Sequence, residues 1–271
     1  LFCSGYYRYF KSKVSLGVPK PGDSTTLAKL GQSWSEPAIG KVKVEEGGNL
    51  VEKWVAFIGG GFDPTETKSQ DATIGRAFFV IDIKTGEIIW EFSYDLGDDK
   101  KKNMPYSMPS PPTAVDINLD GYIDKVYIGD LGGQMWLFDV SFDEVNKKSQ
   151  SLWYSKVKIL FQAPATVAEK HMIYYQPSVA FDKYGIPWVY FGTGDRDNPR
   201  DKTNPPERFY AVKDDGLGNI MYGTYPLKEI DLLNLIGLGI NTFNPDPTMK
   251  GWFIKLTKEP GGGLEKVLAK P

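Results

Sequence analysis

The sequence is poor in the residues that build redox, zinc and general-base chemistry. It contains one cysteine, Cys3, and one histidine, His171, among 271 residues. A single cysteine excludes an intrachain disulfide, a cysteine-rich zinc site and haem attachment through a Cys-x-x-Cys-His motif. A single histidine excludes multi-histidine metal sites and makes most serine–histidine–aspartate schemes depend on one residue. No serine in a nucleophile-elbow context accompanies His171, so we expect it to have a packing or surface role.

Long apolar runs and an excess of positive charge are also missing. No stretch approaches the roughly 18 apolar residues of a membrane-spanning helix, so no membrane span is predicted. The 32 basic and 34 acidic residues leave a net charge of −2, which gives no reason to expect nucleic acid or an anionic membrane as a partner. The first residues lack both a methionine and a signal-peptide pattern. We therefore expect both ends to be cut from a longer chain, whose remainder is one predicted partner.

Glycine, proline and aromatic residues are abundant, and they fall in a repeating order. With 29 Gly, 19 Pro and 14% aromatic residues, the composition favours many short strands joined by turns. Three similar segments each begin a repeat. In every repeat a strand-like second run that ends in glycine follows the opening segment, and a third strand-like run comes after it. The openings are 36–39, 112–115 and 176–179; the second runs are 54–59, 125–129 and 188–192; the third runs are 76–82, 134–139 and 208–214.

An outer strand is visible at 87–92 and another is expected within 152–161. Four short strands that repeat about every 65 to 75 residues, with proline at the strand head and glycine at the turn, predict the blades of an all-β propeller. The segments 5–10 and 251–256 resemble third strands of an earlier and a later blade. One short helix is expected within 228–240, because the leucines and isoleucines there have helical spacing.

These patterns predict that residues 1–271 are part of a single β-propeller domain that is incomplete in this chain. Residues 1–30 would be a partial blade or connector, and residues 31–249 three full blades with long loops. Residues 250–271 would begin a further partial blade. Three blades and two fragments cannot close a ring, so more of the same chain, or another chain, is expected to complete it.

One loop has the spacing of a calcium site. Oxygen donors fall at positions one, three, five and nine of the segment 116–124, and a glycine stands at position six, where the chain must turn sharply. Calcium takes six to eight oxygen ligands, and carboxylates this close repel one another without a cation. The predicted ligands are Asp116, Asn118, Asp120, the backbone carbonyl of Tyr122, and Asp124.

Two features separate this loop from a helical EF-hand. Position twelve is Tyr127, so the bidentate glutamate is missing, and both flanks read as strands. Asp124 is the candidate bidentate ligand in its place. With few carboxylates, we expect an affinity in the micromolar to millimolar range. The alternative is a polar turn that binds no ion.

Two further motifs have structural interpretations. The segment 80–90 resembles the tryptophan-docking motif of quinoprotein dehydrogenases, in which Asp82 and the Thr85-Gly86 pair form a tight turn and Trp90 packs against a neighbouring blade. That motif is architectural, and the adjacent cysteine pair common in quinoprotein alcohol dehydrogenases is impossible here. The acidic, glycine-rich segment 192–201 could bind a second cation or a partner, although a solvated loop is the simpler interpretation.

The order of these motifs resembles one family. The segments 31–39, 78–86 and 112–116, the calcium loop, Lys-Val-Tyr-Ile-Gly-Asp-Leu-Gly-Gly at 125–133, and the segments 136–139 and 191–194 are similar to the C-terminal propeller of the type IV pilus tip and biogenesis proteins called PilY, or PilC in neisserial relatives. The resemblance covers roughly residues 30 to 271 and is most specific from 112 to 140. Asn118 departs from it, because an aspartate often stands there.

The resemblance implies a non-enzymatic, calcium-binding protein at the cell surface or pilus tip, either associated with the outer membrane or extracellular. Such a protein supports pilus assembly and extension, adhesion and twitching motility, with pilins or minor pilins as partners. Its calcium ligands map onto Asp116, Asn118, Asp120, Tyr122 and Asp124. Two alternatives stay open: a quinoprotein-like dehydrogenase, suggested by the docking motif and the repeats, and an extracellular scaffold in which calcium is only structural.

Overall fold

The computed structural model describes residues 29–67, 70–164, 170–199, 206–215, 226–236, 248–256, 266–267 and 269–271. The strand expected at 5–10 lies outside these residues. The chain divides into two compact units, one formed by Leu1–Ile128 with Leu137–Val157 and the other by Gly129–Trp136 with Lys158–Pro271. Each unit is described by itself.

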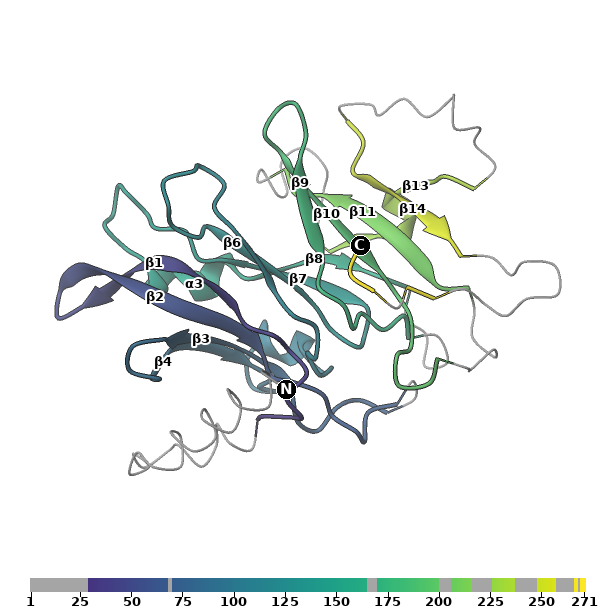
Figure 1. Ribbon diagram of the computed structural model, residues 1–271, viewed down its shortest axis with the longest axis horizontal. Helices are drawn as coiled ribbons and strands as arrows, with labels where there is room; N and C mark the ends of the chain where they lie inside the picture. The colour runs from purple at the N-terminus through teal and green to yellow at the C-terminus, as the bar shows by residue number, and fades with distance from the viewer. Residues whose placement is uncertain are drawn as a thin grey trace. The chain divides into compact units, whose positions relative to one another are not determined.

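The first sheet is an antiparallel meander of four strands in the order β1-β2-β3-β4, visible as neighbouring ribbons in Figure 1. The strands are β1 (Ala38–Glu46), β2 (Asn49–Gly59), β3 (Ala77–Asp82) and β4 (Ile88–Ser93). Val42, Val44, Val55 and Phe57 are fully or almost fully buried, while the residues between them are more exposed. This period of two is what a strand with one face in the core requires. It explains why β-branched and aromatic residues occupy every second position here and more exposed residues stand between them.

The other two sheets repeat the same plan with one extra short strand each. One has the order β12-β8-β7-β6-β5 and the other the order β13-β14-β11-β10-β9. Their strands are β5 (Thr113–Val115), β6 (Lys125–Gly129), β7 (Gln134–Asp139), β8 (Lys158–Gln162), β9 (Ser178–Phe181), β10 (Pro187–Gly192), β11 (Arg208–Lys213), β12 (Leu227–Lys228), β13 (Leu233–Asn234) and β14 (Gly251–Lys255). The prediction of an all-β chain built from four-stranded units is confirmed, because the first three strands of every predicted unit form where the sequence placed them.

Two expectations about the later part of the chain are wrong. The segment 251–256, expected as the third strand of a further blade, forms β14, which pairs antiparallel with β11 in the same sheet. The backbone groups on that edge of β11 need partners, and β14 satisfies them. The short helix expected within 228–240 is not found among its described residues, which form the end of β12, the 3₁₀ turn η2 (Glu229–Asp231) and β13. The remainder of that segment lies outside the description.

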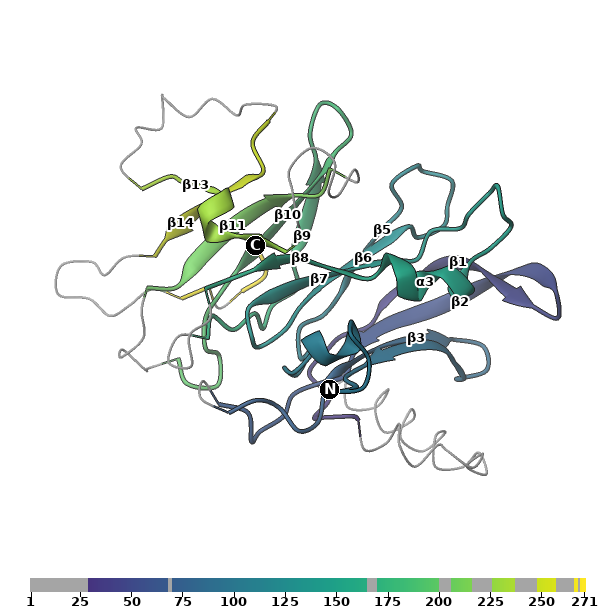
Figure 2. The same cartoon turned by 180° about the vertical axis from the view of Figure 1, so that it is seen from behind.

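The helical spacing failed because it does not produce a buried face. Ile230 is 92% exposed, and Leu233 instead enters a strand that pairs parallel with Trp252. A helix that the sequence pattern did not predict, α3 (Gln150–Lys156), precedes the outer strand β8 and buries Trp153. Figure 2 shows α3 beside the β1–β2 hairpin, and the Ser149 hydroxyl just before the helix donates to the Lys43 carbonyl.

Aromatic side chains form the core of each unit. In the first unit, Phe138 stacks on Phe78 with ring centroids 4.0 Å apart, and Trp90 meets Trp153 edge-on at 5.8 Å. In the second unit, Tyr210 packs against Phe161 at 4.6 Å and stacks on Phe191 at 5.2 Å. Offset and edge-on pairs of this kind add to the free energy of burying the rings.

Candidate metal site

The predicted calcium loop is the hairpin connection between β5 and β6. At its base, the Asp124 N–H donates to the Val115 carbonyl at 2.9 Å, and the Asp124 carbonyl accepts from the Val140 N–H at 2.7 Å. Gly121 has φ of +89° and Leu119 has φ of +62°. Glycine adopts this left-handed conformation at no steric cost, so the sharp turn predicted at position six is present.

The polar side chains of the loop fold inward over its own backbone. Asp116 accepts from the Gly121 N–H at 2.7 Å and from the Asp120 N–H at 3.2 Å. Asn118 Oδ1 accepts from the Asp120 N–H at 2.9 Å, and Asp120 Oδ1 accepts from the Tyr122 N–H at 2.9 Å. Each of these bonds pairs a donor with an acceptor two to five residues earlier, which is why the spacing in the sequence was enough to predict the loop.

Asp124 carries the clearest electrostatic signal. Its Oδ2 accepts from the Ile117 N–H at 2.8 Å and lies 3.4 Å from the Asn118 N–H. Burial raises the pKa of Asp124, and the nearby charges of Asp120 and Asp116 raise it further, against the lowering effect of the two amides. A partly buried carboxylate among like charges is the situation that a bound cation relieves.

The donor set fits a hard cation, although its carboxylates are not gathered around one point. Within the part of the chain that the structure describes, no three Asp, Glu, His or Cys side chains are arranged as a metal-binding group. Within residues 116–124, which are all described, no donor contacts Asp120 Oδ2 or Asp124 Oδ1. These oxygens, with Asp116, Asn118 and the carbonyl at 122, would hold Ca²⁺, whose ligands are oxygens.

The docking motif is architectural, as expected. Asp82 closes a tight turn, accepting from the Lys84 N–H at 2.8 Å and binding the Lys53 ammonium at 2.9 Å. Trp90 on β4 lies 6.2 Å, centroid to centroid, from Phe138 on β7, a strand of another sheet. The motif therefore holds one sheet against the next within the first unit.

His171 is buried, and Asp195 closes a turn directly after β10. His171 Nδ1 lies 2.9 Å from Glu207 Oε2, which also accepts from the Thr193 hydroxyl at 2.6 Å. Asp195 is 8% exposed and accepts from the Asn198 N–H at 3.0 Å. The packing role expected for His171 is confirmed, and Asp195 caps a turn.

Sequence reasoning missed two carboxylates that organise turns from a fully buried position. Asp130, 0% exposed, accepts from the Gly132 and Gln134 N–H groups and from the indole of Trp136, each at 2.9 Å. Asp182 and Trp188 repeat the same spacing of six residues, with an indole bond of 3.4 Å. The repeated aspartate followed by tryptophan six residues later was the signal that could have revealed the first of them.

Asp63, the second missed carboxylate, holds the long loop between β2 and β3. It too is fully buried, and it accepts five hydrogen bonds, from the amides and hydroxyls of Thr65 and Thr73 and from the amide of Ile74. Thr65 and Thr73 lie two and ten residues after Asp63, a spacing that matches no strand or helix period, so nothing local in the sequence marked this aspartate.

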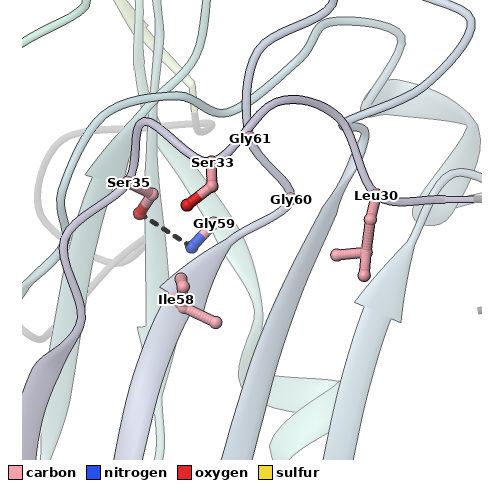
Figure 3. A pocket seen from close by; sticks show the side chains of 7 residues that line it. All are labelled: Leu30, Ser33, Ser35, Ile58, Gly59, Gly60 and Gly61. Carbon is pink, nitrogen blue, oxygen red and sulfur yellow. Dashed lines mark hydrogen bonds between the residues drawn. The ribbon is translucent and has the colours of Figure 1, made fainter. Parts of the chain in front are cut away.

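Figure 3 shows a small pocket lined by two apolar side chains, two serines and three glycines. Ser35 Oγ accepts from the Gly59 N–H at 3.1 Å and donates to the Ser110 carbonyl at 3.0 Å. Both hydrogen-bonding functions of this hydroxyl are therefore used, and the pocket has no titratable side chain. Its lining residues are Leu30, Ser33, Ser35, Ile58, Gly59, Gly60 and Gly61.

Among the described residues, no helix is both long and apolar enough to cross a membrane.

Comparison with known proteins gives a consistent result. The PilY1 β-propeller domain matches residues 15–232. The type IV pilus biogenesis factor PilY1 of Pseudomonas aeruginosa is 30% identical over 118 residues, which are 44% of this chain and 8% of that protein. The PilY1 homologue of Xylella fastidiosa is 31% identical over 93 residues, 32% of this chain and 6% of that protein.

The chain therefore spans less than a tenth of the length of these curated relatives. The crystal structure of the P. aeruginosa PilY1 C-terminal domain superposes with a TM-score of 0.56 and 21% identity, covering 89% of this chain and 54% of that one. Together with the four-stranded antiparallel units, this likeness confirms the propeller fold. Because the family match covers most of the sequence, we conclude that this chain belongs to the family of type IV pilus proteins defined by the PilY1 β-propeller domain.

Proposed function

We propose that this chain is a calcium-binding, non-enzymatic propeller region of a protein at the cell surface or pilus tip. In this role it supports pilus assembly and extension, adhesion and twitching motility, with pilins or minor pilins as its partners. The loop between β5 and β6 is the observation that carries the calcium part of the proposal, because it brings five oxygen donors into nine residues. Membership of the PilY1 family supports the pilus part.

The desolvated, repelled carboxylate of Asp124 supplies the physical reason for calcium. Without a cation, the three carboxylates are held by backbone amides of their own short loop. Calcium offers each of them a stronger partner, so ion binding and loop order are linked. A partner that docks at this end of the sheet then meets an ordered or a loosened surface, depending on the calcium concentration.

Replacing Asp120 with alanine is expected to abolish calcium uptake by the full chain, an affinity loss of about 100-fold or more for a site with few charged ligands. Titration calorimetry measures the loss directly. Asp143→Ala is the matched control, since Asp143 is a partly exposed turn aspartate that accepts from backbone amides outside the loop. Normal calcium binding by Asp120→Ala would show that the site is assigned wrongly.

The cellular part is tested with the same substitution in the full-length pilus protein. Cells that carry Asp120→Ala should lose the calcium dependence of surface piliation and twitching, whereas Asp143→Ala cells should keep it. If the two strains respond to calcium alike, calcium is only structural in this protein and the scaffold alternative holds. Redox turnover with added pyrroloquinoline quinone would instead support an enzyme.

A further inference from the structure

The calcium loop lies against the β1–β2 hairpin, which belongs to a different sheet of the first unit. The Ile123 N–H donates to the Lys41 carbonyl on β1 at 2.8 Å. The Ile123 side chain faces Gly40, where an added Cβ would lie 2.3 Å from Ile123 Cγ1. Only a residue without a side chain permits this approach, so Gly40 allows the loop and the hairpin to touch.

Tyr122 makes the second contact, and it does so with its side chain. Its hydroxyl donates to the Glu52 carboxylate on β2. Its ring lies beneath two ammonium groups of β1, with Lys41 Nζ 4.7 Å and Lys43 Nζ 4.6 Å from the ring centroid. Lys41 also pairs with Glu52 at 3.7 Å. The tyrosine is thus enclosed by three charged side chains of the hairpin, in contacts that combine hydrogen bonding with cation–π attraction.

The two ends of Tyr122 therefore have different tasks. Its backbone carbonyl is a candidate ligand inside the loop, while its ring and hydroxyl belong to the neighbouring sheet. An ion that fixes the carbonyl restricts the backbone of Tyr122, and with it the direction of the Cα–Cβ bond from which the ring projects. The residues joined by this contact, 52 and 122, are 70 positions apart, so it links two sheets and not two parts of one turn.

We propose that Tyr122 and Ile123 transmit calcium binding to the β1–β2 hairpin, so that the ion orders an element of the adjacent sheet. This inference rests on the proposed calcium function and names the element that calcium regulates. The hairpin carries Trp54, which is 58% exposed and pairs with Lys41 across the ladder. Calcium thus controls the order of a strand pair that presents an aromatic side chain to solvent.

Hydrogen exchange of the full chain, read by mass spectrometry with and without calcium, tests the coupling. In the wild-type protein calcium is expected to slow exchange in the peptide that covers residues 41–54 by about two- to fivefold, the scale of contacts between exposed polar groups. In Tyr122→Phe, which loses the bond to Glu52 but keeps the ring and the Ile123 contacts, this slowing should be clearly smaller. Calcium affinity should stay within about threefold of wild type, since the expected ligand at this residue is its carbonyl.

Tyr184→Phe is the matched control, because Tyr184 is an exposed tyrosine of another hairpin turn, between β9 and β10, with 61% of its surface accessible. It should respond to calcium as the wild type does. If Tyr122→Phe keeps the full protection of residues 41–54, or if the wild type binds calcium without protecting them, the coupling is wrong and the calcium proposal stands. If the wild type binds no calcium, both the calcium proposal and the coupling are wrong.

Coupling between two sites is reciprocal, which gives a second test from the hairpin side. Gly40→Ala changes no ligand, yet it should weaken calcium binding by about three- to tenfold, because the new methyl group displaces Ile123. Gly97→Ala is the control, since its Cβ meets only Asp95 at 3.4 Å, an ordinary contact. Unchanged calcium affinity in Gly40→Ala, in a protein that retains its circular dichroism spectrum, would contradict the coupling.

Discussion

Replacing Phe138 with alanine is expected to lower the free energy of unfolding by about 3–5 kcal/mol, the range for truncating a buried aromatic ring. Phe138 is 1% exposed and stacks on Phe78 at 4.0 Å. It also meets Phe92 edge-on at 5.9 Å and Trp90 at 6.2 Å. Because the ring joins strands of two sheets, the cavity left by alanine cannot close without moving one of them.

Urea unfolding of the full chain, followed by tryptophan fluorescence and circular dichroism, measures this loss. Phe138→Leu keeps most of the apolar volume and should cost less than half as much, about 1–1.5 kcal/mol. If Phe138→Ala unfolds within about 1 kcal/mol of the wild type, the ring is not a central contact of the first unit. The two probes should be compared, since two compact units can unfold in separate steps.

Asparagine in place of Asp63 is expected to cost about 3 kcal/mol, because an amide nitrogen then faces backbone and hydroxyl donors in a buried site. Burial by itself raises the pKa of Asp63, but the hydrogen bonds from Thr65, Thr73 and Ile74 outweigh it and lower the pKa to about 2 from the ordinary 3.8. The ionised form is therefore the one that the fold stabilises.

The same shift fixes the sign of a pH dependence. A carboxyl whose pKa is lower in the folded state stabilises the protein above its unfolded pKa, and this stability is lost as the pH falls through the folded value. The contribution of Asp63 should be complete above pH 4 and disappear towards pH 2, an effect of roughly 2 kcal/mol. Unfolding measured at pH 2 to 5 should show this slope in the wild type and a weaker slope in Asp63→Asn.

Asp99→Asn serves as the control for both measurements. The Asp99 side chain is 99% exposed and pairs only with Lys102 three residues along the chain. Screening by water makes such surface pairs worth little, so the unfolding curve should not move. If Asp63→Asn and Asp99→Asn lower the free energy of unfolding equally, the hydrogen bonds to the buried Asp63 carboxylate contribute no more to stability than a surface ion pair does.

Local features of the candidate site were predictable from the sequence. Asp116, Asn118 and Asp120 hydrogen-bond to amides at most five residues away, so their spacing alone specifies the turn. The strand runs were predictable for a similar reason, since side chains alternate between two faces with a period of two. Whether calcium binds there stays a prediction, because the described carboxylates hold amides and do not surround one point.

Other elements needed information from distant parts of the chain. The pattern at 228–236 suggested a helix, yet pairing of Leu233 and Asn234 with β14 prevails. The strand β14 itself was predicted as a strand but assigned to the wrong sheet, because a strand sequence does not specify which edge it pairs with. Tertiary context of this kind overrides local preference wherever backbone groups at a sheet edge need partners.

By itself, the sequence determined the all-β class, the repeated strand units and the loop with five oxygen donors, since each depends on residues close together in the chain. Only the tertiary structure decided what that loop touches. The bond from Tyr122 to Glu52 and the approach of Ile123 to Gly40 arise when separate segments pack together. Their energies depend on distances in space, and no spacing in the sequence encodes those distances.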